Sequence, residues 1–216
     1  MNWLAQIDGY CERTDAAYWS EPINALTNLA FVIGAAVMWR RTNGQPLGRA
    51  LCVILALIGI GSYLFHTHAT AWAALADVAP IGVFILVYLF AVHRDVLGLK
   101  RRIAMFATAM FIPYAAITVP VLNATPFVRI SNFYWTVPIL LFAYAFALRK
   151  RLPDTTEGFA IGGALLCLSI ALRSLDEILC AAFPIGTHFM WHCLNAAMLT
   201  LMIHVYSRHM LATRSL

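Results

Sequence analysis

Long apolar runs are the feature that most restricts what this chain can fold into. A helix that crosses the hydrocarbon core of a bilayer needs about 20 apolar residues, and runs of this kind recur along the whole chain. Seven of them lie at residues 22–39, 50–67, 72–92, 103–122, 131–148, 158–175 and 186–206. With 62% hydrophobic and 12% charged residues, the composition excludes an ordinary soluble domain. We therefore expect an all-α membrane protein, a seven-transmembrane helix bundle.

The connectors between the runs are short, so we expect one transmembrane domain over residues 1–216 without a soluble appendage. Residues 1–21 form a short acidic extracytoplasmic segment in this interpretation. A signal peptide has a basic start followed by an apolar run, whereas the first residues, up to Tyr18, are acidic and amphipathic. The sequence therefore predicts no cleaved signal peptide.

Basic residues mark one side of the expected membrane. Of the 15 lysines and arginines, 12 follow the first, third, fifth and seventh runs, and the exceptions are Arg13, Arg129 and Arg173. The positive-inside rule makes that side cytoplasmic, with the N-terminus outside and the C-terminus inside. This distribution accounts for the net charge of +5, so we expect no nucleic-acid partner.

Three histidines fall on the opposite side. His66 lies near the end of the second run, and His188 and His192 lie four residues apart in the last, which places them on one helix face. An imidazole inside a membrane is costly and marks a functional site by default. Three histidines are a common ligand set of catalytic zinc, with the fourth position left open. The alternative is three separate core histidines, each bonded to the backbone.

Two more polar residues accompany His66. Asp77 follows it by eleven residues, so a short turn brings Asp77 back beside His66 on an antiparallel helix. A carboxylate on an apolar helix needs a partner, and a zinc-bound water, a ligand histidine or simply an arginine of the outer face would supply one. Ser62 lies one turn before His66 on the same face, although serine also packs commonly in membrane helices.

These residues belong to motifs that occur in a set order. Near the N-terminus the chain has Tyr10-Cys11-Glu12-Arg13, then Glu21-Pro22-Ile23-Asn24 and Asn28. The later motifs are Gly59-Ile60-Gly61-Ser62-Tyr63-Leu64-Phe65-His66, then Asp77, and finally His188-Phe189-Met190-Trp191-His192. The ordered set resembles the alkaline ceramidase family, within a superfamily of seven-helix membrane hydrolases that includes the adiponectin and progestin receptors. The resemblance spans nearly the whole chain.

The resemblance implies a zinc ion held by His66, His188 and His192, with Ser62 and Asp77 beside the metal. In that family the N-terminal segment binds calcium, which by position implies Asp8, Tyr10, Glu12, Thr14 and Glu21 as ligands. The chain departs from the family pattern here, because Gly9 and Tyr10 replace Asp-Trp before Cys11 and Thr14 stands where the family has Asn. The residues by themselves fit calcium ligands, a solvated outer segment or, at Glu21, an acidic helix start.

Of the five cysteines, Cys11 and Cys180 both map to the outer side, where a disulfide is chemically permitted. The sequence leaves open whether their sulfur atoms are close enough to bond.

The resemblance and the ligand set together predict a zinc-dependent intramembrane amidohydrolase. It would cleave ceramide, or a related N-acyl lipid, to a fatty acid and a long-chain base. Asp77 would accept a proton from water and pass it to the leaving amine, and Ser62 would donate a hydrogen bond to the oxyanion. The compact length favours a bacterial inner-membrane protein with its site toward the periplasm; in a eukaryote the site would face the lumen of the ER or Golgi.

Two other functions fit parts of the pattern. A seven-helix lipid-binding or receptor-like protein would hold a structural zinc, which takes four protein ligands. A transporter would show helix breaks in paired repeats. Pro113, Pro120 and Pro138 interrupt two of the runs, but no repeat accompanies them.

Overall fold

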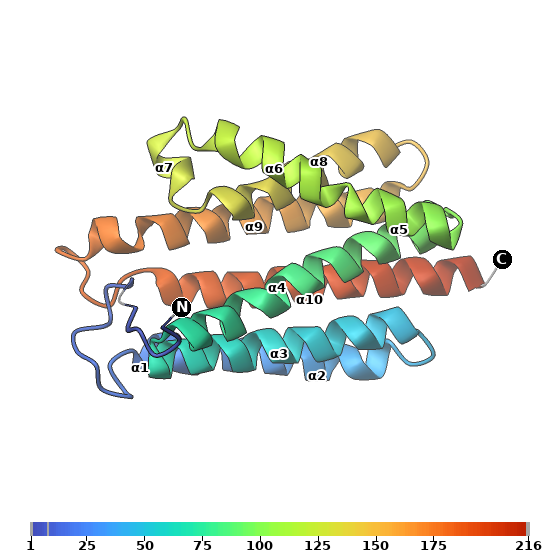
Figure 1. The fold of residues 1–216 in the computed structure, drawn as a ribbon. Coiled ribbons are helices and arrows are strands. Elements are labelled where there is room, and N and C mark those ends of the chain that lie inside the picture. Colours follow the sequence, from blue (N-terminus) through green and yellow to red (C-terminus); the bar gives the residue numbers. More distant parts are fainter. Residues whose placement is uncertain (1, 8, 215–216) are drawn as a thin grey trace.

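The computed structural model describes residues 2–7 and 9–214, and these form helices joined by turns (Figure 1). The helices are α1 (Pro22–Thr27), α2 (Leu29–Arg41), α3 (Pro46–His68), α4 (Ala71–Ala91), η1 (Val92–Val96), α5 (Arg101–Ala109), α6 (Phe111–Leu122), α7 (Pro126–Arg129), α8 (Asn132–Leu148), α9 (Pro153–Leu179) and α10 (His188–Arg214). Within the described part of the chain there is no β-strand, only an isolated bridge between Gln6 and Thr70. The prediction of an all-helical membrane protein is confirmed at this level.

Six helical segments are long and apolar enough to cross a membrane. They are Pro22–Arg41, Pro46–His68, Ala71–Val96, Arg101–Leu122, Pro153–Leu179 and His188–Thr213. The fifth run of the sequence corresponds to α8, a shorter apolar helix of 17 residues. The last two long helices also extend beyond the runs at 158–175 and 186–206, because polar residues at one end of the bundle continue the helical turns.

Several of the runs are interrupted. The first consists of α1 and α2, which meet at Asn28, and the fourth consists of α5 and α6, which meet at Met110. Pro113 lies in the first turn of α6, where its missing N–H removes the bond that would join the two helices. At its C-terminal end, α4 continues into one π-helical turn, η1.

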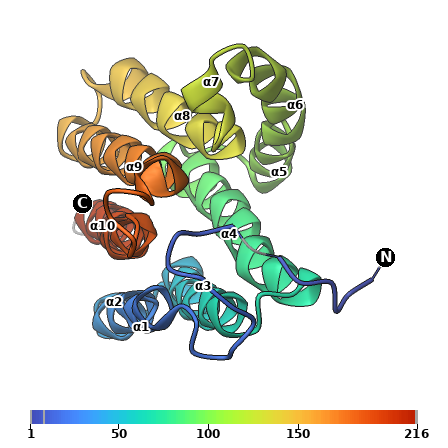
Figure 2. The same ribbon diagram turned by 90° about the vertical axis from the view of Figure 1, so that its left-hand side faces the viewer.

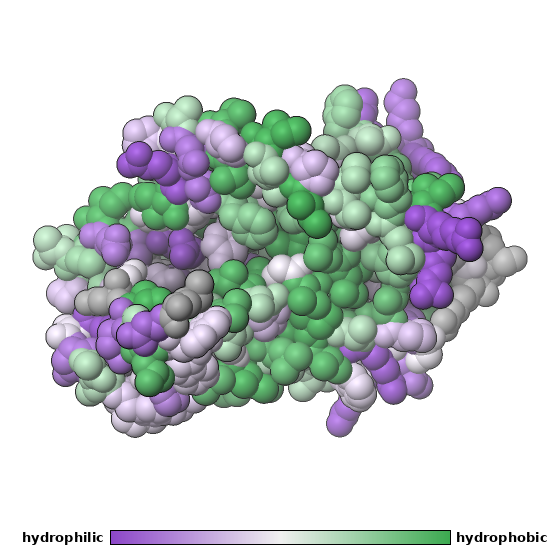
Figure 3. Space-filling view, viewed as in Figure 1, coloured by the Kyte–Doolittle hydropathy of each residue, from purple (hydrophilic) through white to green (hydrophobic). Residues whose placement is uncertain are grey.

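α10 lies between α9 on one side and α2 and α3 on the other, while α3 pairs with α4 and α8 pairs with α9 (Figures 1 and 2). The space-filling view shows an apolar band between two polar ends (Figure 3). We call the end that contains His66 and His188 the site end. The opposite end, with Arg40 and Arg208, is the basic end.

Glycines bring α3 and α4 into close contact at the site end. A Cβ atom on Gly61 of α3 would lie 2.0 Å from the carbonyl oxygen of Ala76 in α4. A Cβ atom on Gly59 would lie 2.9 Å from the carbonyl oxygen of Asn28, where α1 meets α2. Small residues at such positions let two membrane helices approach closely. Because Gly61 and Ala76 precede Ser62 and Asp77 directly, this contact also brings those two side chains together.

The N-terminal segment crosses the site end of the bundle (Figure 2). It is bonded to the turn between α3 and α4: Ile7 N donates to Ala69 O at 2.7 Å and Ala71 N donates to Ala5 O at 3.0 Å. Ala69 adopts the left-handed conformation, with φ of 45°, which ends α3 and allows the immediate return into α4. The segment is therefore held over the histidines of α3 and α10.

We expect Gly61→Ala to lower the free energy of unfolding by about 2 kcal/mol, because a methyl group would press on the backbone of α4. Thermal unfolding of the detergent-solubilised protein measures the change. Gly82→Ala in α4 is the matched control, since its Cβ would meet nothing within 4 Å. Equal melting temperatures for the two variants would contradict the close contact.

Candidate metal centre and lipid cavity

The three histidines predicted from the sequence lie together at the site end. His66 belongs to the last turn of α3, while His188 and His192 occupy the first two turns of α10. One ring nitrogen from each lies within 4.8 Å of the others. All three side chains are buried, with exposed fractions of 0%, 2% and 1%. The structure thus forms a compact nitrogen cluster from two helices that are far apart in the sequence.

Hydrogen bonds fix the ring of His66. Its Nδ1 lies 2.6 Å from Oε2 of Glu21, and its backbone carbonyl accepts a bond of 2.9 Å from Nη2 of Arg13. Burial by itself raises the pKa of Glu21, but the bonds to His66, Arg13 and Asn24 outweigh it and lower the pKa below its usual value. An ionised Glu21 only accepts hydrogen bonds, so Nδ1 of His66 carries the proton and Nε2 has a free lone pair.

The same argument applies to His192. Its Nδ1 lies 2.9 Å from Oγ1 of Thr27. The Thr27 hydroxyl is also 2.8 Å from the carbonyl of Ile23, to which it donates its one proton. It therefore accepts from Nδ1 of His192 and leaves the Nε2 lone pair of that ring free as well.

The two free Nε2 atoms of His66 and His192 lie only 3.1 Å apart. Two lone pairs at this distance repel each other unless a cation or a proton lies between or beside them. Nδ1 of His188 is also buried and makes no hydrogen bond to the described residues. This donor set suits a cation that prefers nitrogen ligands, and three histidines are among the usual ligand sets of zinc.

Asp77 and Ser62 lie beside this cluster. Ser62 is buried on α3, one turn before His66, with its hydroxyl close enough to interact with the Asp77 carboxyl. Asp77 faces a cavity of about 390 Å³ at the site end. Its lining includes Tyr10, Asp77, Tyr134, Arg173, His188 and Trp191. The cavity therefore brings together one histidine of the cluster, the Asp77 carboxyl group and the guanidinium of Arg173.

Arg173 is the cavity residue that the sequence analysis did not single out. It was one of three basic residues outside the basic end, and a charge within an apolar run was the signal that could have identified it. Tyr10 belongs to the set of residues expected to bind calcium. In the structure its ring stacks on the ring of His188, with centroids 3.7 Å apart.

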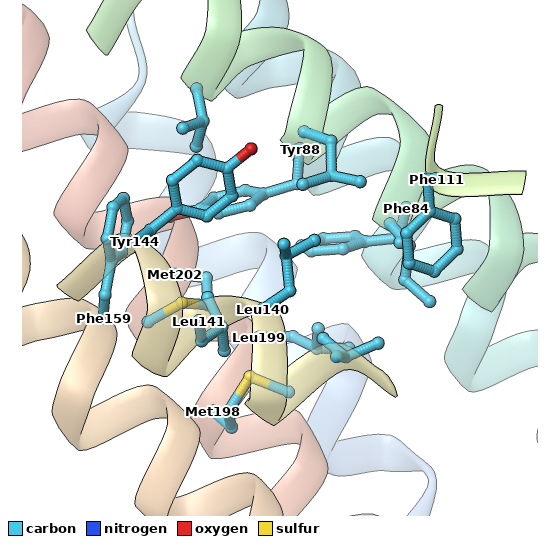
Figure 4. A pocket seen from close by; sticks show the side chains of 14 residues that line it. Phe84, Tyr88, Phe111, Leu140, Leu141, Tyr144, Phe159, Met198, Leu199 and Met202 are labelled. Carbon is cyan, nitrogen blue, oxygen red and sulfur yellow. The ribbon is translucent and has the colours of Figure 1, made fainter. Parts of the chain in front are cut away.

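A second cavity lies deeper between α4, α6, α8, α9 and α10 (Figure 4). Its walls are aromatic and aliphatic side chains, among them Phe84, Tyr88, Phe111, Leu141, Tyr144 and Met202. Phe84 follows Asp77 by seven residues on α4, so this apolar chamber begins about 10 Å farther into the bundle. Its chemistry suits a hydrocarbon chain.

The acidic N-terminal residues have partners that leave little room for calcium. Both carboxylate oxygens of Glu12 accept backbone N–H bonds at the start of α1, from Ile23 at 2.7 Å and Asn24 at 2.8 Å. Glu21 is already bonded to His66, and its Oε1 lies 2.5 Å from Nε of Arg13. A guanidinium thus occupies the place beside Glu21 where a cation would bind. These two carboxylates do not fit a calcium site.

Thr14, another member of the expected calcium set, has a different environment. The side chain of Thr14 is exposed, and its backbone N–H bonds to Oγ of Ser20 at 3.0 Å. Asp8 lies outside the described residues.

Asp176 and a disulfide connect the N-terminal segment to α10. Cys11 and Cys180 are bonded through their sulfur atoms, with Cα atoms 5.3 Å apart. Asp176 Oδ1 accepts the N–H groups of Thr187 and His188 at 2.6 and 2.8 Å, and its Oδ2 accepts that of Cys11 at 2.9 Å. A carboxylate here satisfies free N–H groups at the start of α10 and positions His188 through its backbone.

Comparison with known proteins gives one clear result. The family model described as Ceramidase matches residues 5–215, essentially the entire chain. None of the curated proteins matches the sequence.

We expect Arg13→Gln to lower the free energy of unfolding by about 3 kcal/mol, because it leaves a buried carboxylate without its cation. Arg40→Gln, at the exposed end of α2, should change it by less than about 0.5 kcal/mol. Thermal unfolding with and without millimolar calcium measures both effects. Calcium should not raise the wild-type melting temperature, and a clear rise would overturn the assignment of Arg13 as the cation partner of Glu21.

Proposed function

This chain belongs to the ceramidase family, and from that membership we propose that it is a zinc-dependent intramembrane amidohydrolase. Its substrate is ceramide or a related N-acyl lipid, which it cleaves at the amide to a fatty acid and a long-chain base. The observation that carries the proposal is the buried cluster of ring nitrogens of His66, His188 and His192, one from each within 4.8 Å of the others, with Nε2 of His66 and Nε2 of His192 3.1 Å apart.

The ligand number supports a catalytic rather than a structural ion. Among the described residues the candidate metal cluster consists of the three histidines, with no cysteine, carboxylate or fourth histidine. A structural zinc is held by four protein ligands, whereas a catalytic zinc keeps one position open. Zinc held there supplies a Lewis acid that activates water near neutral pH and polarises an amide carbonyl.

Asp77 is the proton carrier of the proposed reaction. It lines the cavity beside His188, so a water molecule or an amide nitrogen in that space is within its reach. Hydrolysis of an amide requires one proton to leave the attacking water and one to reach the departing amine, and a single carboxyl group can carry out both transfers in turn.

Ser62 positions Asp77 in this proposal. Its hydroxyl is close enough to interact with the Asp77 carboxyl, and the donation to the oxyanion that the sequence analysis expected stays a prediction. Held in this way, the carboxyl group keeps one orientation toward the cavity.

The deeper chamber provides space for the acyl chain. An amide held at the histidine cluster has its carbonyl carbon at the site end, and the chain attached to that carbon runs toward the basic end along α4 and α10. From Asp77 to Val92, at the far wall, α4 advances by 15 residues, or about 22 Å. That length is comparable to a long acyl chain, and the chamber, with a volume of about 50 Å³, would hold its methyl end among Tyr88, Tyr144 and Met202 (Figure 4).

The proposed orientation has seven crossings. α8, at 17 residues, reaches about 25 Å, at the short end of what spans a bilayer. With α8 counted, the N-terminus and the basic end lie on opposite sides, and the basic end is cytoplasmic. The site end then faces the periplasm in a bacterial inner membrane, or the lumen of the ER or Golgi in a eukaryotic cell.

We expect His192→Ala to lose most of its zinc and to release fatty acid and long-chain base from ceramide at least about 100-fold more slowly, because a ligand of the Lewis acid is gone. Elemental analysis and mass spectrometry of the products measure the two effects. His68→Ala is the matched control, since His68 is exposed and lies outside the cluster. A zinc-loaded, folded wild type that releases nothing from several N-acyl lipids would refute the proposal and favour a receptor-like protein.

Asp77→Asn should slow hydrolysis by about 10²- to 10⁴-fold while zinc stays bound, because it removes the proton carrier and not a ligand. Rates and zinc content are measured on the same preparation. If the variant kept more than a tenth of the wild-type rate, Asp77 would not be the acid and base. Loss of zinc together with activity would instead make Asp77 part of the metal site.

A further inference from the structure

Arg173 is a cation that lines the 390 Å³ cavity at the site end, and its hydrogen-bond partners are neutral. Its Nη1 donates to Oγ of Ser131 at 2.8 Å, and its Nη2 lies 3.4 Å from the hydroxyl of Tyr10. The guanidinium also lies over the rings of Tyr134 and Trp191, 5.3 and 5.8 Å from their centroids. Aromatic rings stabilise the cation through their faces and leave its N–H edge free to bind.

No carboxylate in the described part of the chain forms an ion pair with Arg173 within 4.0 Å. Three acids line the same cavity: Asp77, Asp176 and Glu177. Asp176 is bonded to backbone N–H groups through both oxygens. Glu177 lies one turn beyond Arg173 on α9, and its side chain is exposed at the cavity rim. Asp77 interacts with the charge of Arg173 across the cavity without a direct ion pair, so N–H groups of the guanidinium remain free for an anionic ligand.

The position of Arg173 relates it to the reaction. Tyr10 connects the two sites, because its hydroxyl is bonded to Arg173 and its ring stacks on His188. An amide bound at the histidine cluster would therefore share one cavity at the site end with Arg173, whereas the acyl chain is proposed to run toward the basic end. The amine part of the substrate then lies on the side of Arg173.

We infer that Arg173 binds an anionic group on the amine part of the substrate, a carboxylate, phosphate or sulfonate. The inference rests on the proposed amidohydrolase function and narrows its substrate class. The preferred substrates are acidic N-acyl lipids, in which the anion lies within a few bonds of the amide, and neutral ceramide is a poorer substrate. The guanidinium has five N–H donors and its two hydrogen bonds use two, so enough remain for a two-pronged contact with an oxyanion.

The first test compares two substrates that differ in charge and little else, N-palmitoylglycine and N-palmitoylethanolamine. For the zinc-loaded wild type we expect kcat/KM to be about 10- to 100-fold higher for the acid, as is usual when a charge-assisted hydrogen bond is made. Arg173→Gln should bring the ratio close to one by slowing only the acid, and Arg173→Lys should keep part of the preference. Arg129→Gln removes an exposed charge from the same end of the bundle and should keep the full ratio.

The second test measures binding without hydrolysis. Hexadecyl phosphate should raise the melting temperature of the wild type and of Arg129→Gln more than hexadecanol does, and Arg173→Gln should lose most of that difference. Neither probe contains an amide, so this result holds whether or not the protein is an amidohydrolase. Melting temperature and zinc content without lipid show that each variant is folded.

The outcomes distinguish a failure of the proposed amidohydrolase function from a failure of anion binding by Arg173. If no N-acyl lipid is hydrolysed, the proposed function fails, and the hexadecyl phosphate measurement alone decides whether Arg173 binds anions. If lipids are hydrolysed but Arg173→Gln slows the acid and the neutral substrate equally, Arg173 only supports Tyr10 and the inference is wrong. A phosphate effect that survives in Arg173→Gln would likewise overturn it, since another group would then bind the anion.

Discussion

The buried carboxylate of Glu21 is the interaction on which the site end depends. It accepts bonds from Arg13, Asn24 and His66, and so joins the N-terminal segment, the start of α1 and the end of α3 in a single contact. Because it stays ionised, it also determines which nitrogen of His66 carries the proton. A neutral or displaced Glu21 would leave both the segment and the ligand ring without an orientation. Through Glu21, Arg13 therefore supports the orientation of the ring of a histidine of the candidate metal site.

α10 needs a similar support from outside its own sequence. Its first residues carry a ligand histidine, and the free N–H groups there would be costly to bury. Asp176 of α9 satisfies those of Thr187 and His188 and bonds to Cys11 as well, while the disulfide to Cys180 holds the same segment in place. Two acids from outside α3 and α10, Glu21 and Asp176, thus hold the ends of the two helices that carry the histidines. The ligand cluster is rigid because both ends are fixed.

Much of this arrangement could be predicted from local patterns. Apolar runs gave the helices, and the four-residue spacing placed His188 and His192 on one face. The eleven residues between His66 and Asp77 suggested the antiparallel return that Ala69 makes possible. The partners were not predictable in the same way. Thr27 and Arg13 meet their histidines across 165 and 53 residues, and nothing local in the sequence distinguishes Thr27 from a packing residue of an apolar helix.

The sequence by itself therefore determined the membrane helices, the basic end and the residue types able to hold a metal, since hydropathy and helical periodicity act over a few turns. Tertiary structure alone decided what surrounds them. It paired Glu21 with Arg13 rather than leaving the carboxylate free for a calcium ion, brought Ser62 beside Asp77, and placed Arg173 in the cavity without a direct ion pair to any of the acids that line it. Such choices depend on which charged groups share a buried space, and only the packing of distant helices settles that.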